Sequence, residues 1–220
     1  MKRDILMPPP IDYSLYLVIS QNDCRDRDIF TVLDQAVQGG VSLVQLREKT
    51  MPTRDLVALA KKMKSFLARR NIPLIINDRV GVALAVDADG VHVGQDDMHP
   101  LDVRPLIGPH RILGLSINSE DQLQEARKLP VDYLGIGPVF ATQTKKDSKP
   151  VLGLDGLSWL CHTKHIPAVG IGGINAQNAS QVIAAGVDGI AVVSAVCGAD
   201  SSKEAAKELR AAAEQGRLIR

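Results

Sequence analysis

The feature of this sequence that most restricts its fold is an apolar, β-rich run that recurs about every 25 residues. Eight such runs occur, at residues 15–20, 41–47, 73–78, 90–94, 111–117, 132–138, 167–173 and 188–194. Most are continuously apolar rather than alternating, which is typical of parallel strands buried on both faces. The segments between them have helical periodicity. One example is the apolar stripe formed by Leu56, Leu59, Met63, Phe66 and Leu67.

Eight β/α units in 220 residues correspond to the smallest (β/α)8 TIM barrel, and this α/β fold is what the sequence predicts. A doubly wound open sheet is the alternative, although it usually needs fewer strands. The segments AVQGGVSLVQL, AVDADGVHVG and AAGVDGIAVVS form a weak internal repeat that runs from a helix end into a buried strand. We see no linker composition, so we expect one catalytic barrel domain over 14–220, preceded by an N-terminal extension over 1–13.

Local signals predict where several helices begin and end. Ser119 with Gln122 and Ser201 with Glu204 match capping boxes. Asn175 is predicted to cap the seventh helix, and Gly186 to end it. The lysines and arginines on the outer face of the second helix are interpreted as a solvated surface rather than as an anion-binding patch.

Composition excludes several classes of protein. The 26 basic and 25 acidic residues give a net charge of +1, and aromatic residues make up 3%, so neither nucleic acid nor an anionic membrane is an expected partner. No run approaches the ~18 apolar residues of a membrane span, and the prolines in MKRDILMPPP argue against a signal peptide. Cys24, Cys161 and Cys197 form no CxxC pair, so neither a disulfide framework nor a zinc site is expected. A cytoplasmic protein is predicted.

In such a barrel the site forms at the carboxyl ends of the strands, and polar residues gather there along this sequence. The second run ends in Gln45, Arg47 and Lys49, which suit a phosphate-bearing ligand. A surface ion pair between Arg47 and Glu48 is the simpler alternative for the arginine.

Acidic residues end the next two runs. Asn77 and Asp78 end the third, and Asp96 and Asp97 come directly after the fourth. Carboxylates brought to one rim repel each other unless a cation lies between them, and Mg²⁺ fits if substrate phosphates complete its ligand set. Alternatively, Asp78 and Asp96 could cap the helices that follow.

The remaining strand ends add small and flexible residues. Ser116 follows a glycine at the end of the fifth run, where it binds a ligand or caps the fifth helix. The loop after the sixth run carries Thr142, Thr144 and Lys145, which suits a lid that contacts phosphate; a merely solvated loop is the alternative. Gly172 and Gly173 end run seven, and Val193 and Ser194 end run eight, next to the loops where these barrels commonly bind phosphate.

Motifs for other chemistry are missing from the sequence. No P-loop, GxSxG elbow or complete GxGxxG motif occurs. The five histidines are scattered, and His92, which could point into the barrel, is interpreted as structural. We therefore expect a site for two phosphate groups and a divalent metal, with no obvious general base or nucleophile.

The sequence resembles the thiamine-phosphate synthase family. The resemblance rests on QLREK at 45–49, IND at 76–78, GVHVGQDD at 90–97, GPVFATQTKK at 137–146, GIGGI at 170–174 and VVSA at 192–195, and it extends over about residues 13–215. It implies a transferase that joins a hydroxymethylpyrimidine diphosphate to a thiazole phosphate, with Mg²⁺ as cofactor and these two small molecules as its substrates. It also implies a dissociative reaction in which pyrophosphate leaves before the thiazole nitrogen attacks.

The resemblance also implies roles for individual residues. Asp78 and Asp97 would bind Mg²⁺, with Asp97 favoured over Asp96. The thiazole phosphate would be held by Thr142, Thr144, Gly172 or Gly173, Val193 and Ser194. The pyrimidine diphosphate would be held by Gln45, Arg47, Lys49, Asn77, Ser116 and Lys145, of which Arg47, Lys49, Lys145 and Ser116 are the expected catalytic residues.

Two other functions remain open at this point. A thiazole tautomerase would resemble this barrel but would not need the acidic pair and Lys145, which are both present. A non-catalytic sensor of phosphate ligands is the second alternative, and turnover of both substrates would separate it from an enzyme.

Overall fold

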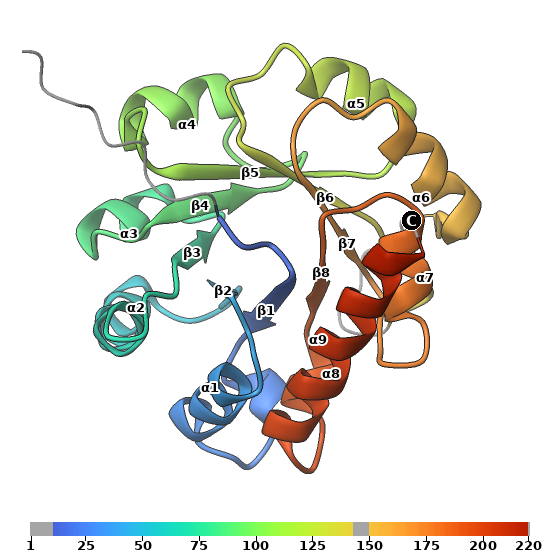
Figure 1. The fold of residues 1–220 in the computed structure, drawn as a ribbon. Helices are drawn as coiled ribbons and strands as arrows, with labels where there is room; N and C mark the ends of the chain where they lie inside the picture. The colour runs from blue at the N-terminus through green and yellow to red at the C-terminus, as the bar shows by residue number, and fades with distance from the viewer. Residues whose placement is uncertain (1–10, 143–149, 220) are drawn as a thin grey trace, which may run out of the picture.

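In the computed structural model, which describes residues 11–142 and 150–219, eight parallel strands close into a barrel with helices around it (Figure 1). Strands pair in sequence order, and β8 pairs with β1 to close the sheet. The predicted (β/α)8 TIM barrel is therefore confirmed, and the open-sheet alternative is wrong. The strands are β1 (Leu15–Ile19), β2 (Leu43–Leu46), β3 (Leu74–Asn77), β4 (Gly90–Val93), β5 (Ile112–Ile117), β6 (Tyr133–Ile136), β7 (Ala168–Ile171) and β8 (Gly189–Val192).

Helices follow the strands and cover the outside of the barrel (Figure 1). They are α1 (Ile29–Gln38), α2 (Thr53–Ala68), α3 (Val80–Ala85), α4 (Pro100–Ile107), α5 (Glu120–Ala126), α6 (Gly153–His162), α7 (Ala179–Ala184), α8 (Ser194–Cys197) and α9 (Ser202–Leu218). A 3-10 turn, η1 (Asn22–Cys24), precedes α1. The short α8 is an addition to the eight regular units and lies directly after β8.

Most of the predicted helix ends are confirmed. The Ser119 side chain accepts the N–H of Gln122 at the start of α5, and Ser201 accepts that of Glu204 at the start of α9. Gly186 follows α7 with a φ of 114°, a conformation that glycine adopts without strain. The prediction for Asn175 is wrong, because α7 begins at Ala179 and Asn175 lies in the turn before it.

The apolar stripe of α2 packs against the outer face of the sheet, where Leu56, Met63 and Leu67 are fully buried. A second cluster fills the lower part of the barrel interior and consists of Tyr13, Tyr16, Leu43, Ile75, Tyr133, Val169 and Ala191. It contains all three tyrosines of the chain. Tyr13 belongs to this cluster although the sequence places it in the N-terminal extension; the domain boundary itself stays a prediction.

A reciprocal pair of hydrogen bonds recurs at the amino-terminal end of the barrel. It joins the start of each odd-numbered strand (β1, β3, β5, β7) to the residue that directly precedes the next even-numbered strand (β2, β4, β6, β8). The preceding residue donates its backbone N–H to the carbonyl of the odd-strand residue, and its side chain accepts the N–H of the same odd-strand residue. The pairs are Ser42 with Leu15, Asp89 with Leu74, Asp132 with Leu113, and Asp188 with Ala168, with side-chain bonds of 3.2, 2.7, 2.7 and 2.9 Å. We call these pairs the strand brackets. Ser42, Asp89 and Asp188 lie within the three segments of the weak sequence repeat, so a recurring hydrogen-bonding position accounts for part of that repeat.

Each aspartate of the strand brackets also meets a cation that precedes the odd strand. Lys64 on α2, Arg104 on α4 and Lys164 after α6 lie 2.6 Å from Asp89, Asp132 and Asp188. Every bracket aspartate therefore ties an odd strand, an even strand and a neighbouring cation together.

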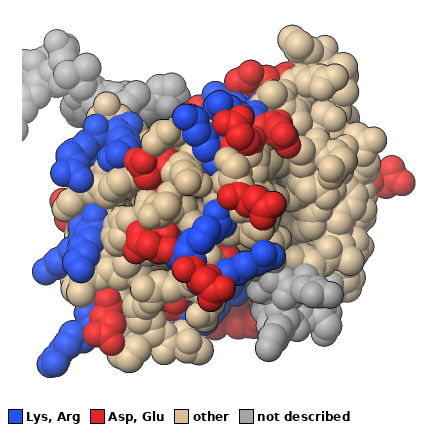
Figure 2. Space-filling model, turned by 90° about the horizontal axis from the view of Figure 1, so that it is seen from below, with Lys and Arg blue, Asp and Glu red and all other residues tan. Residues whose placement is uncertain are grey.

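The surface carries both signs of charge. On the face in Figure 2, basic and acidic side chains are interspersed, as expected from a net charge of +1. None of the helices within residues 11–142 and 150–219 combines the length and the apolar character needed to cross a membrane.

Removing one strand bracket should destabilise the barrel without touching the site at its other end. We expect Asp89→Ala to lower the free energy of unfolding by about 1–3 kcal/mol, because the N–H of Leu74 and the ammonium of Lys64 lose a charged partner. Glu125→Ala, which breaks an exposed pair with Lys128, is the control and should cost less than about 0.5 kcal/mol. Urea unfolding measures both. Equal effects would show that the bracket has no special structural role.

Candidate functional site

A cavity of about 1110 Å³ lies in the upper barrel interior, among the carboxyl ends of the strands and the loops after them. In a (β/α)8 barrel this is the end where active sites form. Its walls combine apolar strand residues with polar groups from almost every strand end. Among the residues that line it are Tyr16, Val18, Gln45, Arg47, Asn77, His92, Ser116, Asn118, Thr142, Ile171, Gly172, Gly173, Asn175, Val193 and Ser194.

The structure brings most of the predicted site residues together. Gln45, Arg47, Asn77, Ser116, Thr142, Gly172, Gly173, Val193 and Ser194 line the cavity. Lys49, Asp78 and Asp97 do not line it. Lys49 and Asp78 follow Arg47 and Asn77 in the sequence, and Asp97 is next to Asp78, so these three form its rim. Thr144 and Lys145 lie outside the described residues.

The rim holds two carboxyl groups side by side. Lys49 Nζ lies 2.5 Å from Asp78 Oδ2, and the side chain of Asp97 also interacts with the carboxyl group of Asp78. Burial and the neighbouring Asp97 raise the pKa of Asp78, and Lys49 only partly opposes this. The backbone N–H of Gly94 donates to Asp97 Oδ2 at 2.7 Å, which fixes that side chain. Asp96, by contrast, is exposed.

The capping alternative for the aspartates is wrong. Helix α3 begins after Arg79 with no side-chain cap, and α4 is capped by His99, whose ring nitrogen accepts the N–H of Leu101. Ser116 likewise caps nothing, because Ser119 caps α5. Asp78 itself adopts a φ of 59°, in the left-handed region that most residues other than glycine avoid and that aspartate and asparagine enter more readily.

The loop after β2 is held by Arg79, which no sequence signal had pointed to. The guanidinium of Arg79 donates to the backbone carbonyls of Lys49 and Met51 at 3.1 and 2.9 Å, and so joins the β3 end to the β2 loop. Glu48 accepts the N–H of Gln21 at 2.6 Å, and Arg47 forms no ion pair with any residue that the structure describes. The expected alternative of an Arg47–Glu48 pair is therefore wrong, and the Arg47 guanidinium is left facing the cavity.

The glycines after β7 not only would let the backbone come close to a ligand but also make room for the loop after β6. Gly172 and Gly173 have φ values of 103° and 64°, and a Cβ on Gly173 would lie 2.7 Å from the carbonyl oxygen of Ala141. These glycines therefore also let the loop after β6 pack against the loop after β7. Asn178 holds the same loop by donating from Nδ2 to the Gly173 carbonyl at 3.0 Å.

At the floor of the cavity, five side chains, all but one of which line it, are joined by hydrogen bonds through the barrel interior. Gln45 Nε2 donates to Tyr16 Oη at 2.7 Å, and Tyr16 Oη lies 2.8 Å from Tyr133 Oη. His92 Nδ1 lies 2.8 Å from Tyr133 Oη, and its Nε2 lies 2.8 Å from Ser116 Oγ. We call this series the interior chain. The histidine that the sequence analysis took as structural points inward, as the alternation suggested, and its ring also lines the cavity.

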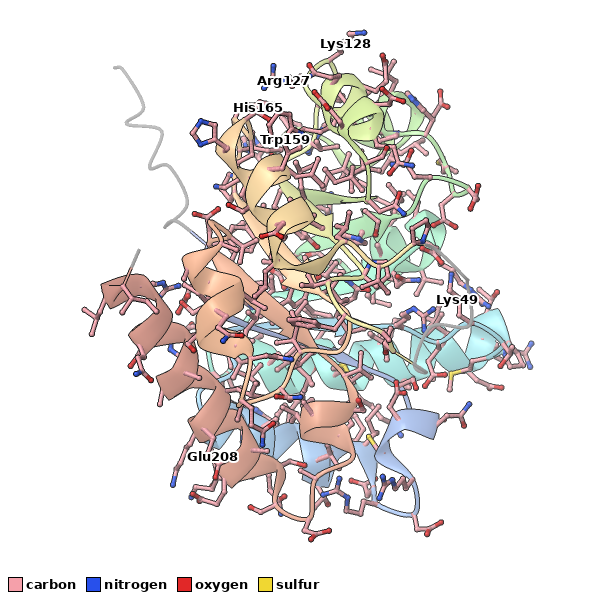
Figure 3. All side chains as sticks on the ribbon, turned by 90° about the vertical axis from the view of Figure 1, so that its right-hand side faces the viewer. Lys49, Arg127, Lys128, Trp159, His165 and Glu208 are labelled. Atoms are coloured by element: carbon pink, nitrogen blue, oxygen red, sulfur yellow. The ribbon has the colours of Figure 1, made fainter. Side chains whose placement is uncertain are left out.

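Other cavity residues had weaker sequence signals. Tyr16 shares the inward face of β1 with Val18, and alternation within the run LYLVIS could have identified it. Asn118 lies two residues beyond Ser116, and nothing in the sequence singles it out. Asn175 follows the glycine loop, and its predicted role is a helix cap rather than a place in the cavity wall. The exposed Trp159 is not part of the site, since Figure 3 shows it with Arg127 and Lys128 far from Lys49.

Together these groups suit a ligand with separate anionic parts. Arg47, Lys49 and the acidic pair lie at the ends of β2 to β4, and the glycine and serine loops lie at the ends of β7 and β8 on another side of the cavity. Within the described residues, no cluster of three or more histidine, cysteine or acidic side chains could hold a metal by itself. Two carboxylates alone suit a metal that keeps ligands from water or substrate, as Mg²⁺ does.

The sequence matches the family described as thiamine monophosphate synthase over residues 15–196. It is 53% identical to the thiamine-phosphate synthase of Solidesulfovibrio magneticus over 211 residues, covering 96% of this chain and all of that protein. The thiamine-phosphate synthase of Xanthobacter autotrophicus is 47% identical over 206 residues, 94% of this chain and 98% of the relative. The thiamine phosphate pyrophosphorylase structure from Pyrococcus furiosus superposes with a TM-score of 0.85 at 38% identity, covering 94% of this chain and 98% of that one. The chain belongs to the thiamine monophosphate synthase family.

Proposed function

We propose that this protein is a thiamine-phosphate synthase, a transferase of thiamine biosynthesis. It condenses 4-amino-2-methyl-5-hydroxymethylpyrimidine diphosphate with 4-methyl-5-(2-phosphoethyl)thiazole to give thiamine phosphate and pyrophosphate. The observation that carries the proposal is one cavity with a charged rim at β2–β4 and with glycine- and serine-bearing loops at β7–β8. Two substrates, one a diphosphate and one a monophosphate, fit these two places.

The diphosphate is assigned to the rim. Arg47 and Lys49 offer the cations, Asn77 a neutral donor, and Lys145, outside the described residues, a further cation by its place in the sequence. Asp78 and Asp97 fit Mg²⁺, because two adjacent carboxylates offer the oxygen ligands that this cation takes, and without it the neighbouring Asp97 helps to raise the pKa of Asp78. When bound, Mg²⁺ would neutralise negative charge on the leaving pyrophosphate.

The chemistry of the reaction explains why the cavity needs no general base. The attacking thiazole nitrogen has a lone pair and carries no proton, so nothing has to be removed from it. The bond that breaks joins a pyrimidine methylene to a diphosphate oxygen, and the electron-rich ring can carry the positive charge that develops. The protein therefore has to hold the partners in line and stabilise the leaving group through Arg47, Lys49 and Lys145.

The thiazole phosphate is assigned to the loops after β7 and β8. Gly172, Gly173, Val193 and Ser194 border the cavity there, and glycine allows a close approach of backbone N–H groups to phosphate oxygens. Thr142 comes from the loop after β6 and borders the same part. The tautomerase and sensor alternatives are not favoured, because neither accounts for the acidic pair.

A direct assay tests the function. Purified protein, both substrates and Mg²⁺ should give thiamine phosphate and pyrophosphate in equal amounts, detected by chromatography and by a pyrophosphate assay. Binding of both substrates without any product would favour the sensor, and isomerisation of the thiazole alone would favour the tautomerase.

Asp97→Asn should separate the metal site from fold stability. Mg²⁺ should raise the Tm of the wild type, because it binds only the folded state, and the variant should need about tenfold more Mg²⁺ or lose the shift. Without metal, the variant should be as stable as the wild type or more so at neutral pH, since the repulsion that raises the pKa of Asp78 is gone. An acid whose pKa is raised by folding makes the folded protein less stable as pH rises through that pKa. The stability that Asp97→Asn gains at neutral pH should therefore vanish near pH 4, where aspartates are protonated.

Asp96→Asn is the matched control for this prediction, because it makes the same change at the exposed neighbour. It should leave the Mg²⁺ dependence of both Tm and turnover unchanged. A larger effect of Asp96→Asn than of Asp97→Asn would overturn the assignment of Asp97, and a wild type indifferent to Mg²⁺ would overturn the metal site itself.

Ser194→Asp should test whether the phosphate of the thiazole substrate binds beside Ser194. Ser194 is exposed and begins α8, where a carboxylate is compatible with the helix, so the fold should be retained. Repulsion at contact distance should raise the KM for the thiazole phosphate more than tenfold, with a much smaller effect on the pyrimidine diphosphate. Ser194→Asn, of nearly the same shape but neutral, is the control for size. Equal increases of both KM values in Ser194→Asp would show that the loop does not discriminate between the substrates.

A further inference from the structure

The interior chain links two cavity residues through three side chains that the proposed mechanism does not use. Gln45 on β2 and Ser116 on β5 are its ends, and both border the cavity. Tyr16, Tyr133 and His92 lie between them, on β1, β6 and β4. Every contact is 2.7–2.8 Å long, so each is a good hydrogen bond.

Counting protons gives the interior chain a direction. The amide nitrogen of Gln45 donates to Tyr16 Oη. The assignment that then gives both buried phenol protons an acceptor has Tyr16 donating to Tyr133 and Tyr133 donating to His92 Nδ1, which is unprotonated in that assignment. The ring proton of a neutral His92 is consequently on Nε2 and points to Ser116 Oγ, and the hydroxyl proton of Ser116 is free to be donated elsewhere.

The surroundings enforce this arrangement. Tyr16 and Tyr133 are at most 1% exposed, and burial raises the pKa of both phenols, so each remains a protonated donor that must find an acceptor. Gly114 makes room for these rings, because a Cβ there would lie 2.2 Å from the Tyr133 ring and 2.4 Å from His92 Nδ1. The two rings can therefore lie this close only because residue 114 has no side chain.

The two ends of the interior chain then offer opposite groups. Gln45 makes no other hydrogen bond with the described residues, so its Oε1 is an acceptor available at the cavity. Ser116 Oγ, which accepts from His92, is a donor at the cavity. An aminopyrimidine has the complementary pattern, since its exocyclic amino group donates and its ring nitrogens accept.

We propose that the interior chain is a polarised relay that fixes Gln45 Oε1 as an acceptor and Ser116 Oγ–H as a donor, and so selects an aminopyrimidine over an oxopyrimidine. Tyr16, Tyr133 and His92 are positioning residues in this scheme, because they act through Gln45 and Ser116. The inference deepens the proposed function and rests on it for the identity of the substrate. The reverse polarity, with the Gln45 amide turned over, would make Ser116 an acceptor and favour the opposite ring pattern.

The tautomer of His92 tests the polarity directly and needs no turnover. In the full-length wild type labelled with ¹⁵N-histidine, the resonances of His92, assigned by loss in His92→Gln, should show Nδ1 unprotonated and Nε2 protonated at neutral pH. A proton on Nδ1 would overturn the proposal, whether the ring is charged or is the other neutral tautomer.

Selectivity tests the consequence. Titration calorimetry with Mg²⁺ should show that the wild type binds the aminopyrimidine diphosphate at least about tenfold more tightly than its 4-oxo analogue, since the wrong pattern leaves buried polar groups unpaired. Tyr133→Phe interrupts the relay and should lose most of this preference. Tyr13→Phe is the matched control, because its ring packs 5.1 Å from that of Tyr133 but lies outside the relay, and it should keep the preference.

The outcomes separate this inference from the proposed function. A preference that is the same in wild type, Tyr133→Phe and Tyr13→Phe would overturn the relay even if thiamine phosphate is formed. Should Tyr133→Phe fail to fold, Gln45→Leu, which removes the acceptor at the cavity, should abolish the preference instead. A wild type that forms no thiamine phosphate would refute the function, whereas the His92 tautomer would still report the polarity.

Discussion

A closed barrel of eight strands has an interior that side chains must fill, and this protein fills the lower half with its three tyrosines. Aromatic rings occupy that space well, but two of the phenol groups end up fully buried and must be hydrogen-bonded. The partners available in the interior lie above them, on neighbouring strands, and they continue to the cavity floor. Two buried hydroxyl groups need hydrogen-bond partners, and this need determines which groups at the cavity floor donate and which accept. The packing of the barrel interior therefore also determines what the cavity can bind.

The two ends of the barrel have different roles: the amino-terminal end fixes the register of the strands, and the carboxyl-terminal end carries the groups that line the cavity. At the amino-terminal end the strand brackets repeat with the same geometry, and they fix how far each odd strand is shifted against the next even one. A slip of one residue would turn every inward side chain outward, so this register decides whether Gln45, Arg47 and Ser116 face the cavity at all. The carboxyl ends have no such repeat, which leaves each loop free to carry a different chemical group.

Much of this could be predicted from the sequence because it depends on neighbours along the chain. The strands, the capping serines of α5 and α9, and the gathering of polar residues at strand ends follow from local pattern and from the topology of parallel strands. The contacts of His92 could not be predicted in the same way. Its partner Tyr133 is 41 residues away, and the Tyr16–Tyr133 bond spans 117 residues, so no local signal reports that these groups meet. Gly172 and Gly173 were assigned to a ligand alone because the sequence does not show the β6 loop that packs against them.

The charge of the rim has a consequence for the order of binding. The rim residues Lys49, Asp78 and Asp97, taken together with Arg47 of the cavity wall, carry two positive and two negative formal charges, so this part of the site is formally neutral. A bare diphosphate meets the two carboxylates as well as the cations, and a bare divalent cation meets the two cations as well as the carboxylates; each is attracted and repelled at the same time. A diphosphate that arrives with a divalent cation brings both signs and can place each against its opposite. On the proposed function, this part of the site would therefore favour a diphosphate that arrives with its divalent cation over either one alone.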